Sequence, residues 1–142
     1  MTVQITIIGL GQVGASIGLA LASHKDSVVC VGHDKDFSIE RAAQQKGAVD
    51  KTEHNLPKAV QDARLVLLAL PVHQVRETLE FIAPDLMPGT VVVDTSPIKS
   101  GVATWAREIL PENCYYVGIV PTIAAEFLQE TGTGLDSAKA DL

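Results

Sequence analysis

Cysteine and basic residues are scarce in this 142-residue sequence, and each shortage narrows what the protein can be. The two cysteines, Cys30 and Cys114, lie in separate apolar stretches without a C-x-x-C partner, so we interpret them as packed thiols in a reducing cytosol. Lysine and arginine number 11 against 17 acidic residues, and the resulting net charge of −6 argues against a surface that binds nucleic acid. No group of His, Cys and Asp has the spacing of metal ligands, so no metal site is predicted.

Charge is absent from residues 2–23, a stretch that could be mistaken for a membrane span or a signal peptide. The stretch has no basic segment at its start, and four glycines together with Gln12 and Ser16 interrupt it. A buried parallel strand followed by a helix that packs on a sheet explains it better. We therefore expect a soluble, cytoplasmic protein with no membrane partner.

Apolar runs of strand length alternate with helical patterns along the chain, which is long enough for one buried core. This alternation predicts a single α/β domain with a doubly wound parallel sheet. The predicted strands are Val3–Ile8, Val28–His33, Ala48-Val49, Leu65–Leu70, Thr90–Val93 (followed by Asp94) and Cys114–Val117. The predicted helices are Gln12–Ser23, Ser38–Lys46 with Ser38 as N-cap, Leu56–Asp62, Val72–Ile82 and Lys99–Leu110.

A G-x-G-x-x-G motif at residues 9–14 joins the first predicted strand to the first predicted helix. In this context Gly9 permits a tight turn, Gly11 admits a pyrophosphate close to the backbone, and Gly14 lets the helix pack on the strand. Free amides at the start of the helix attract phosphate, and the helix dipole favours the negative charge. The motif predicts a Rossmann-type dinucleotide-binding domain, the alternative being a glycine-rich turn without a ligand. Its expected cofactor contacts are Gly9, Leu10, Gly11, Gln12, Val13 and Gly14, with the pyrophosphate over the amides of Gln12 and Val13.

An acidic residue, Asp34, ends the second predicted strand twenty residues after Gly14. At this spacing a carboxylate accepts hydrogen bonds from the adenosine ribose, which selects NAD and repels a 2′-phosphate. The alternative is a solvated turn residue, and the neighbouring Lys35 could tolerate a phosphate, which leaves NADP open. Ligands sit at the carboxyl ends of the strands, so we expect Leu70, Pro71, Ser96 and Pro97 to flank the nicotinamide half.

Three segments together resemble the nucleotide-binding half of prephenate and arogenate dehydrogenases, enzymes of tyrosine biosynthesis. They are residues 7–16 (IIGLGQVGAS), 68–72 (LALPV) and 87–94 (MPGTVVVD). The family's Asp-Val-Gly-Ser-Val-Lys segment corresponds here to residues 94–99 (DTSPIK). The resemblance implies a NAD(P)-dependent oxidoreductase that passes a hydride from a ring carbon to the nicotinamide, with decarboxylation helping to drive aromatisation.

The resemblance fails at the residues that would carry the chemistry. The family's histidine that contacts the ring hydroxyl of the substrate falls on Val120, which cannot move a proton. The family's serine falls on Pro97, with Ser96 adjacent. His73 is the only histidine predicted near the nicotinamide, where it is either a general base or an exposed residue of a first helical turn. The catalytic residues therefore stay unassigned, with Ser96 and His73 as candidates.

Residues 134–142 (GLDSAKADL) resemble a family stretch that leads into one more strand and then a helical domain. In the family that domain supplies dimerisation and much of the substrate pocket. We expect residues 1–121 to form the dinucleotide-binding domain and residues 122–142 to be a tail toward a missing C-terminal domain. The chain would then be truncated at its C-terminus and inactive alone, and the whole protein a homodimer that acts on a small molecule.

Two other functions remain open. One is a different oxidoreductase with the same glycine motif, acting on a hydroxyacid or an imine. The other is a nucleotide-binding module without catalysis, which serves as a sensor or as part of an assembly.

Overall fold

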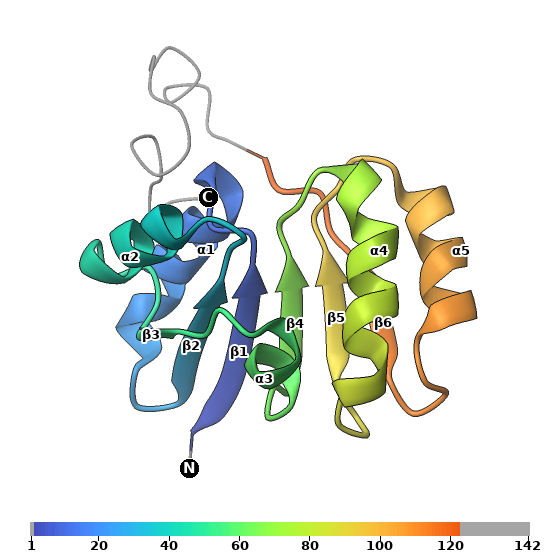
Figure 1. Cartoon of the computed structure of the whole chain (residues 1–142), viewed down its shortest axis with the longest axis horizontal. Coiled ribbons are helices and arrows are strands. Elements are labelled where there is room, and N and C mark those ends of the chain that lie inside the picture. The colour runs from blue at the N-terminus through green and yellow to red at the C-terminus, as the bar shows by residue number, and fades with distance from the viewer. Residues whose placement is uncertain (1, 123–142) are drawn as a thin grey trace.

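Six parallel strands form one sheet with helices on both faces in the computed structural model, which describes residues 2–122 (Figure 1). The order across the sheet is β3-β2-β1-β4-β5-β6. The strands are β1 (Val3–Ile8), β2 (Val28–His33), β3 (Lys51–Thr52), β4 (Leu65–Leu68), β5 (Val91–Asp94) and β6 (Tyr115–Gly118). The helices are α1 (Gln12–Leu21), α2 (Phe37–Gln45), α3 (Leu56–Val60), α4 (Val72–Ile82) and α5 (Lys99–Ile109). Chain order reverses between β1 and β4, so the predicted doubly wound, Rossmann-type fold is confirmed.

The central strands are buried on both faces, because successive side chains point to opposite sides of the sheet. On one face Ile7 and Leu67 pack with Ala15 of α1 and Ala43 of α2. On the other face the adjacent strand residues pack against α3, α4 and α5. Burial on both sides is why the sequence of these strands reads as continuous apolar runs rather than alternating ones.

The third strand lies three residues later than predicted. Ala48 and Val49, the predicted strand, are buried in the core but do not pair with the sheet. The backbone of Ala48 instead lies against α1 at Gly18, where a Cβ would collide with the Ala48 carbonyl oxygen. Their apolar character therefore serves packing, and the short β3 pairs with Val31 and Gly32 of β2.

The cap of α2 also differs from the prediction. Ser38 was expected to cap the helix, but the cap is Asp36, whose Oδ1 accepts hydrogen bonds from the Ser38 amide (2.8 Å) and hydroxyl (2.7 Å). Ser38 thus lies inside the first turn and donates to the cap instead of acting as one.

Other boundaries move by one or two residues. The helix of α1 ends at Leu21, followed by a 3₁₀ turn over Ala22–His24, and a second such turn, Ala83–Asp85, extends α4. The strand β4 ends at Leu68 instead of Leu70. Of the predicted tail, residues 123–142 lie outside the described part of the chain.

Both cysteines are free thiols. Burial, reinforced by the nearby charge of Asp50, raises the pKa of Cys30 to about 11, so this residue is an inert thiol at neutral pH. Within residues 2–122, no helix is both long enough and apolar enough to cross a membrane.

Candidate functional site

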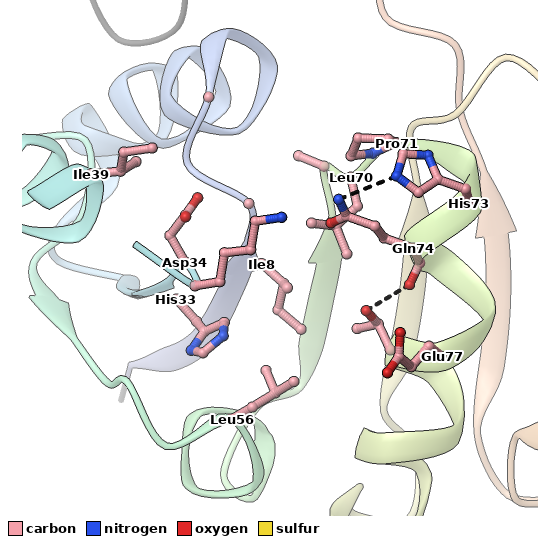
Figure 2. Close-up of a pocket in the computed structure, with 15 residues that line it drawn as sticks. Ile8, His33, Asp34, Ile39, Leu56, Leu70, Pro71, His73, Gln74 and Glu77 are labelled. Atoms are coloured by element: carbon pink, nitrogen blue, oxygen red, sulfur yellow. Dashed lines mark hydrogen bonds between the residues drawn. The ribbon is translucent and has the colours of Figure 1, made fainter. Parts of the chain in front are cut away.

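A cleft of about 670 Å³ opens at the carboxyl ends of β1 and β4, the point at which the strand order reverses (Figure 2). One wall carries His33, Asp34 and Ile39, from the end of β2 and from α2. The opposite wall carries Leu70 and Pro71 before α4, and polar residues of α4 itself. Doubly wound sheets bind their ligands in this crevice, so the fold alone marks it as the candidate site.

The glycine loop borders the cleft through Gly9 and Gly11, and the backbone of the loop requires glycine at two positions. Gly9 has φ +93°, in the left-handed region, and a Cβ on it would collide with the Ala69 carbonyl oxygen. A Cβ on Gly14 would collide with the carbonyl oxygen of Gly9, so any side chain here would push α1 away from the loop. The geometry therefore agrees with the roles predicted from the sequence, a tight turn at Gly9 and close helix packing at Gly14.

Gly11 is different, because nothing lies within 4 Å of the place where its Cβ would be. The residue lines the cleft, so a side chain here would project into open space that a ligand can occupy. Gly11 is also the N-cap of α1, and no side chain caps the helix. The first amides of α1 are thus available to an anionic group, which the helix dipole favours.

Asp34 lies beside this loop at the end of β2. Its Oδ2 accepts a hydrogen bond from the Leu10 amide (3.0 Å), and its Oδ1 accepts one from the Asp36 amide (3.0 Å). The Asp34 amide donates to Oε1 of Glu40 (3.0 Å), a buried residue of α2. Hydrogen bonds therefore fix both the backbone and the carboxylate of Asp34, which lines the cleft.

The structure divides the eleven predicted cofactor contacts into two groups. Those that line the cleft are Gly9, Gly11, Asp34, Leu70 and Pro71. The remaining six, which are not among its lining residues, are Leu10, Gln12, Val13, Gly14, Ser96 and Pro97. The Leu10 side chain is fully buried, and only its amide faces the site, through Asp34.

Sequence reasoning missed part of the cleft wall. His33, which is not among the predicted site residues, lines the cleft, and its Nδ1 donates to the Glu53 carbonyl oxygen (3.0 Å). Gln74, Glu77 and Thr78 line it from α4, next to the core-facing Val75 and Leu79. The available signal was the helical spacing of these polar residues directly after the β4 turn, since that turn borders the point of strand reversal.

A second polar cluster lies at the end of β5. Asp94 is fully buried, and its Oδ2 accepts hydrogen bonds from the Ser96 hydroxyl (2.8 Å), the Lys99 ammonium (3.3 Å) and the Tyr116 hydroxyl (3.4 Å). Burial, the Asp94 charge and this hydrogen bond raise the pKa of Tyr116 to about 12. The Ser96 hydroxyl is therefore engaged by a carboxylate.

The two remaining residues of catalytic interest lie apart. Val120 follows β6 and is 61% exposed, so no imidazole stands at the position where the resemblance places a histidine. His73 lines the cleft from the first turn of α4 and is exposed, with its Nε2 3.5 Å from Nε2 of Gln74 (Figure 2). Of the two catalytic candidates, Ser96 and His73, His73 lines the cleft and Ser96 does not.

The glycine loop, the uncapped α1 and the carboxylate at the end of β2 define a Rossmann domain of the dinucleotide-binding class. The chain matches the family described as "Prephenate dehydrogenase, nucleotide-binding domain" over residues 17–142, and it belongs to this family.

The chain is also similar to curated dehydrogenases of two kinds, and its fold is that of a solved prephenate dehydrogenase. The chain is 33% identical to the prephenate dehydrogenase of Lactococcus lactis subsp. cremoris over 75% of its own length and 30% of that relative. It is 30% identical to the glycerol-3-phosphate dehydrogenase [NAD(P)+] of Photorhabdus laumondii over 98% of its length and 44% of that enzyme. The structure of prephenate dehydrogenase from A. aeolicus, in complex with hydroxyphenyl propionate and NAD+, superposes with a TM-score of 0.82 at 21% identity, over 97% of this chain and 46% of that one. The chain thus spans less than half of each of these proteins.

Proposed function

We propose that this chain is the cofactor-binding part of a NAD-dependent dehydrogenase related to prephenate and arogenate dehydrogenases, with NADP as the alternative cofactor. One observation carries the proposal: the Asp34 carboxylate is fixed to the Leu10 amide of the glycine loop at the cleft (3.0 Å). An acid at this position is the feature by which such domains accept the adenosine ribose. The family match and the dehydrogenase relatives support it.

The residues at the cleft fit a dinucleotide. The first amides of α1 would hold the pyrophosphate, because Gly11 leaves the approach open. Asp34 would accept the ribose hydroxyls, and Leu70 and Pro71 would border the nicotinamide half. The nicotinamide, when bound, would serve as the hydride acceptor. The apolar side chains of Ile8, Leu56 and Leu70 would exclude water from parts of the cleft.

Replacing Asp34 tests the cofactor assignment. Asp34→Ala should weaken NAD binding by about tenfold, as expected when a hydrogen bond to a charged group is lost, and should weaken NADP binding less. The measurement is calorimetric titration of both nucleotides into the 142-residue chain. Asp62→Ala, which removes an exposed carboxylate outside the cleft, is the charge-matched control and should bind like the wild type. Equal losses for NAD and NADP would show that Asp34 does not select the cofactor.

We further propose that the chain binds nucleotide but does not turn over substrate alone. Support comes from the nonpolar Val120 and from the relatives, which are more than twice as long as their matched regions. Reduction of NAD should be undetectable with prephenate, arogenate or glycerol 3-phosphate. Turnover of any of them by the 142-residue chain would contradict this, and its loss in His73→Ala would identify His73 as the base.

For the whole protein we propose two substrate classes. A tyrosine-pathway dienyl acid is favoured by the family match, and glycerol 3-phosphate by a relative that aligns with 98% of the chain. We propose residues 1–121 as the nucleotide-binding domain and residues 122–142 as the connection to a further domain. We also propose that the whole protein is a cytoplasmic homodimer.

A further inference from the structure

A buried carboxylate, Glu40, lies behind the cleft and is not among the residues that line it. Glu40 belongs to α2 and is 3% exposed. It is on the side of the helix that faces the core, next to the fully buried Ala43. Burying a carboxylate is costly unless its oxygens are hydrogen-bonded, and an aliphatic side chain would fill such a position at lower cost. The contacts of Glu40 therefore indicate what it does.

Both of its oxygens are occupied. Oε1 accepts the hydrogen bond from the Asp34 amide (3.0 Å), and each carboxylate oxygen is 3.1 Å from Nδ1 of His54. His33 Nδ1 lies farther, 3.7 Å from Oε1. The ring of His54 stacks on Phe37 at 3.6 Å between centroids, which covers the contact from outside. Glu40 thus joins the turn after β2 to the turn after β3.

Each of the two turns supplies a residue to the same wall of the cleft. Asp34 comes from the first turn, and Leu56, the first residue of α3, directly follows the second; both line the cleft (Figure 2). Lys35, which also lines the cleft, follows Asp34 directly. An acidic and a basic residue are thus neighbours in the sequence at this wall of the cleft.

We propose that Glu40 is a positioning residue that sets the preference for NAD over NADP without contacting either. The inference rests on the proposed function. Glu40 holds the Asp34 backbone so that the carboxylate, rather than the Lys35 ammonium, meets the 2′ position. A 2′-hydroxyl then gains an acceptor, while a 2′-phosphate meets a negative charge.

The test is the ratio of NADP to NAD dissociation constants for the 142-residue chain and its variants. Glu40→Leu fills the buried space but cannot accept the Asp34 amide, and it should lower the ratio by about tenfold. Glu40→Gln keeps an oxygen for the Asp34 amide and an amide for His54, so it should retain the wild-type ratio. His54→Phe keeps a ring against Phe37 but loses the hydrogen bond to Glu40. It should lower the ratio by a smaller factor and provides the test if Glu40→Leu does not fold.

A matched control separates positioning from stability. Val102→Ala removes buried apolar contacts of α5, which packs on the opposite face of the sheet from α2. It should lower the melting temperature and leave the ratio unchanged. An unchanged ratio in Glu40→Leu and His54→Phe would overturn the inference, and so would equal losses for both nucleotides. If the wild-type chain binds neither nucleotide, the proposed function itself is wrong. That outcome is seen with the wild type alone and is therefore distinct from a failure of the inference about Glu40.

Discussion

At the scale of single residues, Glu40 and Asp94 are buried carboxylates within residues 2–122, and each lies at the centre of a group of hydrogen-bond donors. Glu40 holds the turn that carries Asp34, and Asp94 gathers Ser96, Lys99 and Tyr116 at the end of β5. In both groups a buried carboxylate accepts hydrogen bonds from several protein donors instead of from water. These bonds hold the backbone at the carboxyl edge of the sheet. Rigid positioning of this edge is what a binding site requires.

The raised pKa of Tyr116 leads to a prediction. Folded-state stability from this group is fully present below pH 10.0, its ordinary pKa, and is lost as pH rises through about 12. The chain contains two tyrosines, so Tyr115→Phe leaves Tyr116 as the single phenol. Its ultraviolet titration should have a midpoint near 12, while circular dichroism confirms that the protein is folded. A midpoint near 10 in the folded protein would contradict the assigned contact with Asp94.

At the scale of elements, the sequence predicted what depends on local pattern. Val3–Ile8, Val28–His33 and Val72–Ile82 have the bounds that their apolar patterns indicate. The strand predicted at Ala48 and Val49 was wrong, because apolar residues packed beneath a neighbouring helix have the same sequence pattern as a buried strand. Glu40 and His54 gave no signal at all. They lie fourteen residues apart, and only the fold brings them together.

The cap of α2 supports a second prediction. Hydrogen bonds from the hydroxyl and amide of Ser38 lower the pKa of Asp36 from its ordinary value of 3.8. The stability that this carboxylate contributes is present above that value and is lost as pH falls through the lower pKa of the folded state. Asp36→Asn keeps a capping oxygen but does not titrate, so its melting temperature should fall less on acidification below about pH 4. Parallel losses in wild type and variant would contradict the assignment.

At the scale of the whole molecule, the helices cover the sheet unevenly. In the described residues, α1 and α2 lie over β1 to β3 on one face, while α3, α4 and α5 lie on the other (Figure 1). Tyr116 faces the second group of helices, so Tyr115 and Val117 point to the face on which neither α1 nor α2 reaches β6. They are 61% and 44% exposed, and β6 pairs only with β5 among the described strands. An exposed edge with an apolar row is a surface that favours association.

We therefore expect a second copy of the chain to cover β6. Strand edges offer unpaired backbone groups, and two-fold dimers are the commonest assemblies of identical chains. Light scattering over a range of concentrations should show a dimer for the wild type. Val117→Lys places a charge on the edge and should give a monomer with an unchanged NAD affinity, because Val117 lies outside the cleft. Arg107→Glu, a charge change on α5, is the control and should leave the dimer intact. A wild-type chain that stays monomeric at every concentration, or a Val117→Lys variant that still dimerises, would show that β6 is not the contact between copies.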